Sequence, residues 1–74
     1  MSGTAASPGT VSALQAALAA EHAAVYGYGV AGAMLSGADR TAAMNDWMLH
    51  QDARDTLRVM IARLGAVPVA ASRR

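Results

Sequence analysis

The sequence predicts an all-α fold, an antiparallel two-helix hairpin that supplies half of a four-helix bundle. In two stretches of the 74-residue chain, apolar residues recur in steps of four and three, the spacing of helices that pack through one stripe. A short break at Ser36-Gly37 separates the two stretches, and a loop of about four residues forces consecutive helices to run antiparallel. No stretch has the alternating pattern of a β-strand.

The first helix is predicted to begin between Ser7 and Ser12 and to run to about Leu35. Ser7 followed by Pro8 offers an N-cap with proline at the first helical position, whereas Ser12 and Gln15 offer a capping box slightly later. The residues that repeat at heptad spacing, which we call the first seam, are Leu14, Leu18, Glu21, Val25, Tyr28, Gly32 and Leu35.

The second helix is predicted over Arg40–Leu64. Asp39 is a good N-cap, Gly65 supplies a left-handed stop, and Pro68 prevents the helix from resuming. Its seam, the second seam, consists of Ala43, Trp47, His50, Arg54, Leu57, Ile61 and Leu64.

Glu21 is a carboxylate on a seam that is otherwise apolar or aromatic, and an unpaired buried carboxylate is costly. Counting outward from the loop places Tyr28 opposite Trp47, Val25 opposite His50, and Glu21 opposite Arg54. We therefore expect a structural ion pair between Glu21 and Arg54.

The chain divides into three predicted parts. Residues 1–9 are rich in Ser, Gly, Ala and Thr and are expected to be disordered, residues 10–66 form the hairpin, and residues 67–74 form a flexible tail. The beginning of the chain lacks the basic region of a signal peptide, so a cytoplasmic protein is expected.

The amino-acid composition excludes some kinds of cross-link, metal site and binding partner. The chain has no cysteine, which excludes disulfides and thiolate metal sites. Its net charge is +1, with six Arg and no Lys, and no basic stripe that would bind nucleic acid.

Each helix also carries a second apolar face that a single hairpin does not cover. On the first helix this face is small and comprises Ala20, Ala23, Ala24, Gly27 and Ala31. On the second helix, Met44 and Met48 flank Trp47, with Leu49 and Met60 on the other shoulder. These faces predict a homo-oligomer or a complex with a second helical hairpin.

Gly27, Gly29 and Gly32 reproduce the spacing of the dinucleotide-binding fingerprint. That fingerprint works only in a turn from a strand to a helix, and here a helix precedes it. We expect the glycines to permit close approach between helices.

Glu21 and His50 are the leading candidates for metal ligands, with Asp46 and His22 as weaker ones. Di-iron sites in helical bundles take carboxylates from facing helices together with Glu-x-x-His pairs. The residue three before His50 is Trp47, so one hairpin lacks that pair. Iron is the metal that such a site would bind, and the sequence predicts no other cofactor.

A membrane hairpin is a further alternative. Residues 13–35 are long enough to cross a bilayer, but Glu21 and His22 fall inside them and the second helix is strongly charged. We expect no membrane association.

Three motifs resemble those of a ferritin-like domain of unknown function found in high-GC (actinobacterial) bacteria. They are Ala20-Glu21-His22-Ala23-Ala24-Val25-Tyr26-Gly27-Tyr28-Gly29-Val30, then His50-x-x-x-Arg54-Asp55-x-Leu57, and finally Leu64-Gly65-Ala66-x-Pro68. The resemblance covers Leu14 to about Pro68. It implies a four-helix bundle with two hairpins in one chain and no established reaction, and it carries over Glu21, His50, Arg54 and Asp55.

The sequence thus predicts an assembly or binding module without catalysis. The first alternative is an iron-binding oxidase that is active as an oligomer of half-ferritins, and the second is the membrane hairpin.

Overall fold

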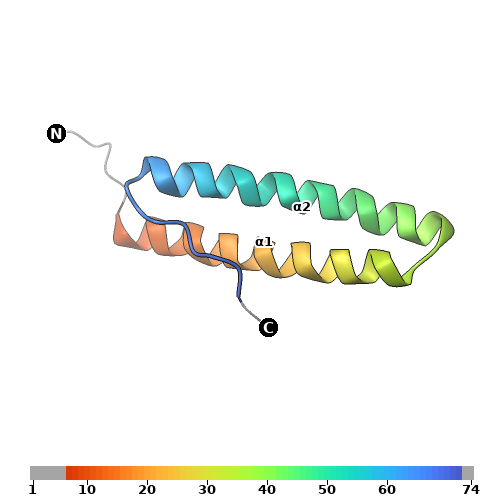
Figure 1. The fold of residues 1–74 in the computed structure, drawn as a ribbon. Helices are drawn as coiled ribbons and strands as arrows, with labels where there is room; N and C mark the ends of the chain where they lie inside the picture. Colours follow the sequence, from red (N-terminus) through yellow and green to blue (C-terminus); the bar gives the residue numbers. More distant parts are fainter. Residues whose placement is uncertain (1–6, 73–74) are drawn as a thin grey trace.

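The computed structural model describes residues 7–72 and shows two long α-helices side by side, followed by an extended segment (Figure 1). Helix α1 spans Pro8–Met34 and helix α2 spans Gly37–Arg63. The molecule measures 55 × 23 × 14 Å, so it is a layer one helix thick. The prediction of an all-α antiparallel hairpin is confirmed.

Helix α1 begins at the earlier of the two predicted positions. The Oγ of Ser7 accepts a hydrogen bond from the backbone N–H of Thr10 at 3.2 Å, and Pro8 occupies the first helical position. Pro8 and Gly9 were expected to be disordered but belong to this helix. The rest of the predicted disordered segment, residues 1–6, lies outside the described residues.

Helix α2 begins three residues earlier than predicted. Gly37, with φ of +60°, is its first residue, and Ser36 rather than Asp39 stands at the N-cap without a side-chain hydrogen bond. The left-handed glycine lets the chain reverse within Leu35 and Ser36 alone. Asp39 lies in the first turn, where its carboxylate complements the positive end of the helix.

Helix α2 ends as predicted at a left-handed glycine. Gly65 has φ of +85° and donates its N–H to the carbonyl of Ala62 at 3.0 Å, while Ala66 donates to the carbonyl of Ile61 at 3.2 Å. This pair of bonds is the Schellman motif, which satisfies carbonyls left free by the last turn.

The two predicted seams face each other. All of their residues are buried or half-buried except Leu35 and Leu64, which are 39% and 37% exposed. Near the loop, the side chains of α2 lie close to the glycines of α1: a Cβ on Gly29 would lie 3.4 Å from Nε1 of Trp47, and one on Gly32 would lie 2.9 Å from Sδ of Met44. Of the three glycines expected to permit close approach, Gly32 alone lies where a Cβ would be too close to its neighbour, because the contact at Gly29 would be an ordinary one and a Cβ on Gly27 would meet nothing within 4 Å.

After α2 the chain turns back and follows α1, a path that the sequence did not predict (Figure 1). The side-chain amide of Gln15 brackets Pro68: its Nε2 donates to the carbonyl of Val67 at 2.7 Å, and its Oε1 accepts from the N–H of Val69 at 2.8 Å. We call residues 67–72 the strap. The segment expected to be a flexible tail thus has a defined course as far as residue 72.

The hairpin buries few of its large apolar side chains. Only Leu18 and Ile61 are fully buried among the described residues. The exposed large apolar side chains, each at least 37% accessible, are Tyr26, Val30, Met34, Leu35, Met48, Leu49, Val59, Met60, Leu64, Val67 and Val69. Within residues 7–72, neither helix contains a window apolar enough to cross a membrane.

Candidate functional site

Glu21 and His50, the leading candidates from the sequence, meet between the helices. The Nδ1–H of His50 donates a hydrogen bond to Oε1 of Glu21 at 2.5 Å. The side chains of His50 and Glu21 are 35% and 23% exposed, so the pair is partly desolvated. The ring of Tyr28 stacks on the imidazole, with centroids 5.3 Å apart and an interplanar angle of 18°. We call these three residues the central cluster.

The hydrogen bond between His50 and Glu21 determines which imidazole nitrogen of the central cluster stays free. A carboxylate only accepts, so Nδ1 of His50 carries the proton and Nε2 is the nitrogen left to accept a proton or bind a metal. A carboxylate on the first nitrogen also fixes the orientation of the ring.

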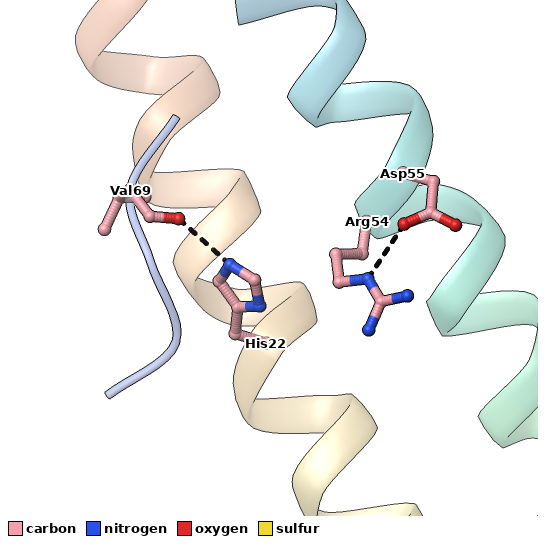
Figure 2. Close-up of polar contacts among 4 residues, drawn as sticks. All are labelled: His22, Arg54, Asp55 and Val69. Carbon is pink, nitrogen blue, oxygen red and sulfur yellow. Dashed lines mark hydrogen bonds and ion pairs between the residues drawn. The ribbon is translucent and has the colours of Figure 1, made fainter. Parts of the chain in front are cut away.

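Arg54 pairs with its neighbour instead of with Glu21. Its Nε donates to Oδ1 of Asp55 at 3.0 Å (Figure 2). Among residues 7–72, the side chain that pairs with Glu21 is His50, so the structure differs from the predicted Glu21–Arg54 pair. The prediction matched residues whose Cα atoms lie at the same height along the two helices. A long side chain extends about one turn along its helix, so its charged end can lie at a different height from its Cα atom.

The other metal candidates lie away from the central cluster. His22 donates through Nε2 to the carbonyl of Val69 at 3.0 Å, on the strap (Figure 2), and Asp46 is exposed on α2. No group of three His, Asp or Glu side chains that could hold a metal occurs within residues 7–72. The residues that one chain brings together therefore do not fit a di-iron site, which needs several carboxylates and histidines.

A small cavity lies between α1 and the strap. Its volume is ≈ 170 Å³, and its lining is Ala19, His22, Ala23, Tyr26, Val69, Ala70, Ala71 and Ser72. Ligand pockets are usually about 300–1,000 Å³, so this cavity is smaller than a typical ligand site.

The glycine fingerprint has no nucleotide-binding context. Gly27, Gly29 and Gly32 all lie inside α1, and the described residues contain no strand. A dinucleotide fingerprint needs the turn between a strand and a helix.

Sequence reasoning did not identify two of the contributors described above. The seam pattern predicts that Tyr28 lies opposite Trp47, but its ring stacks on His50. The sequence pattern indicates a capping role for Gln15, whereas its hydrogen bonds to the strap join residues more than fifty positions apart. Helical periodicity could not have revealed that contact, because the strap has no regular structure of its own.

Comparison with known proteins gives a family and no function. No curated protein and no solved structure matches the chain. A family model described as "Domain of unknown function (DUF4439)" matches residues 13–73, which include both seams, the central cluster and the strap. The chain therefore belongs to the DUF4439 family of domains of unknown function.

Proposed function

We propose that this hairpin is an assembly module whose functional unit is two copies packed face to face as a four-helix bundle. Its role is binding and assembly rather than catalysis. The observation that carries the proposal is the size of the core, because Leu18 and Ile61 are the only large side chains that are fully buried in the part of the chain that the structure describes. Small chains without disulfides bury too little surface to offset the loss of conformational entropy, and they need a metal or a partner.

The face available to a partner follows from the strap. Residues nine positions apart differ by two and a half helical turns and lie on opposite sides of a helix. Gln15 and His22 bind the strap, so Ala24 and Ala31 lie on the opposite side of α1. We call this side of the hairpin the open face.

On α2 the open face carries large apolar side chains. Arg58 lines a groove with Pro68 of the strap, and Leu49, nine positions before it, therefore points away from the strap. Leu49 is 65% exposed and Met60, which shares its side of α2, is 43% exposed. The open face also runs the full length of the hairpin, as the face of a bundle must.

The experiment compares two neighbouring residues of similar exposure on opposite shoulders of α2, Leu49 at 65% and Met48 at 58%. We expect Leu49→Glu to shift the mass measured by sedimentation equilibrium from dimer towards monomer, because it buries a charge in the interface. Met48→Glu should leave the mass unchanged. Equal effects of both changes, or none of either, would refute the open face as the interface.

The second candidate function is metal-dependent oxidation, and the observation that favours it is the meeting of Glu21 and His50. Against it, the hydrogen bond from His50 already engages Glu21. Anaerobic loading with Fe(II), followed by oxygen, tests this candidate beside a Glu21→Ala control. Turnover that depends on Glu21, with two irons per pair of chains, would favour the oxidase over the assembly module.

A further inference from the structure

We infer that two copies pack α2 against α2 antiparallel, about a two-fold axis that passes between Arg54 and Asp55. This inference rests on the proposed assembly and goes further, because it fixes which helices meet and in which register. The occupant of the open face is a second copy of this chain.

The open face of α2 has its own heptad repeat. The residues spaced by three and four along it are Asp46, Leu49, Ala53, Thr56, Met60 and Arg63. Antiparallel coiled helices pair the two kinds of seam position, a with d. A two-fold axis through the Arg54–Asp55 midpoint places each residue of this repeat opposite another residue of the same repeat on the second copy. Each pair joins opposite charges, two large apolar residues or two small residues. The pairs are Asp46 with Arg63, Leu49 with Met60, and Ala53 with Thr56.

Asp46 and Arg63, the charged residues at the two ends of this repeat, can contact each other only between two chains. Asp46 and Arg63 are both exposed, and neither forms an ion pair within residues 7–72. They lie seventeen residues apart on one straight helix, a separation of about 25 Å. They therefore cannot meet within one hairpin, but the two-fold axis brings each to its opposite charge on the second copy. Charges at the edge of an interface chiefly select partner and register.

The small residues of helix α1 are compatible with the same axis. Its open face carries small residues at heptad spacing, and these are Ala13, Ala17, Ala20, Ala24, Gly27 and Ala31. This set is symmetric about position 22, since Ala20 then pairs with Ala24, Ala17 with Gly27, and Ala13 with Ala31.

The register of the hairpin connects the two axes. The side chain of Trp47 reaches Gly29 with its Nε1, and the side chain of Met44 reaches Gly32 with its Sδ. Carried along the hairpin, these contacts place the Arg54–Asp55 midpoint within about one helical turn of the centre of the small-residue repeat on α1, one turn being the reach of the contacting side chains. One two-fold axis can thus relate both helices to their copies. The small residues on α1 would allow the two α1 helices to approach closely, and Leu49 of one α2 would pack against Met60 of the other.

The test is charge reversal at the ends of α2, read as the dimer dissociation constant by sedimentation equilibrium at low salt. Asp46→Arg and Arg63→Asp should each weaken dimerisation about tenfold or more, because each places like charges together. The double reversal Asp46→Arg/Arg63→Asp should return the constant to within about threefold of wild type. Helical circular dichroism at high concentration checks that each chain is folded.

The outcomes separate this inference from the proposed function. If the wild-type chain does not dimerise, the proposed function fails and the inference fails with it. If the wild type dimerises but the single reversals have no effect, or the double reversal does not rescue, the α2–α2 register is wrong while the assembly stands.

Cross-linking gives a second measurement that does not depend on charge. The chain has no cysteine, so introduced thiols are the only ones present. A chain with Leu49→Cys mixed with a chain with Met60→Cys should oxidise to the mixed disulfide faster than either chain does with itself. Faster self-cross-linking of Leu49→Cys would contradict the inferred register.

Discussion

At the scale of single residues, the central cluster shows how a charge is accommodated on an apolar seam. The sequence identified Glu21 as a residue that needs a partner, and the structure supplies His50 with Tyr28 stacked on it. The partner could not be predicted, because His50 and Arg54 lie on the same seam one turn apart. Which of the two contacts Glu21 depends on the direction of its side chain. Arg54 instead donates a hydrogen bond to Asp55.

Double-mutant cycles separate the two pairings of Glu21. Removing Glu21 with Glu21→Met and His50 with His50→Leu should give a coupling energy of about 1 kcal/mol, the modest value expected for a charge-assisted hydrogen bond that is partly exposed. The same cycle with Arg54→Met should give a coupling near zero. The readout is urea unfolding at one fixed chain concentration, and a larger coupling to Arg54 would restore the pairing predicted from sequence.

At the scale of elements, local chemistry predicted the helices and their ends well. Ser7 with Pro8 begins α1, Gly65 ends α2, and both seams lie between the helices as the heptad spacing required. The start of α2 was misplaced because Asp39 is a good cap in isolation, whereas the positive φ of Gly37 allowed an earlier start. The strap could not be predicted, since its contacts with α1 are long-range hydrogen bonds.

The role of Gln15 in holding the strap is directly testable. Gln15→Ala removes the donor to Val67 and the acceptor from Val69, and the Val69 amide should then exchange with solvent faster while amides in the middle of α2 keep their protection. Gln51→Ala is the matched control, since Gln51 is half-buried on α2. Unchanged exchange at Val69 after Gln15→Ala would show that the clamp does not hold the strap.

At the scale of the whole molecule, the hairpin has well-formed helices and a very small core. Each helix has a cap or a stop, yet within residues 7–72 the fully buried large side chains are Leu18 and Ile61 alone, which is why we propose a partner. The strap covers part of one face, and the open face keeps a second heptad repeat on each helix. The sequence indicated this surplus of apolar surface, but not which face stays open, because that depends on the course of the strap.

The central claim, that the hairpin is stable only as a pair, is tested most directly by following thermal unfolding at several chain concentrations while measuring mass by sedimentation equilibrium. We predict a mass twice that of the 7.5 kDa chain and a melting temperature that rises with concentration, since dimerisation stabilises the folded state by mass action. A species of 7.5 kDa that unfolds sharply at one temperature, whatever the concentration, would contradict the account.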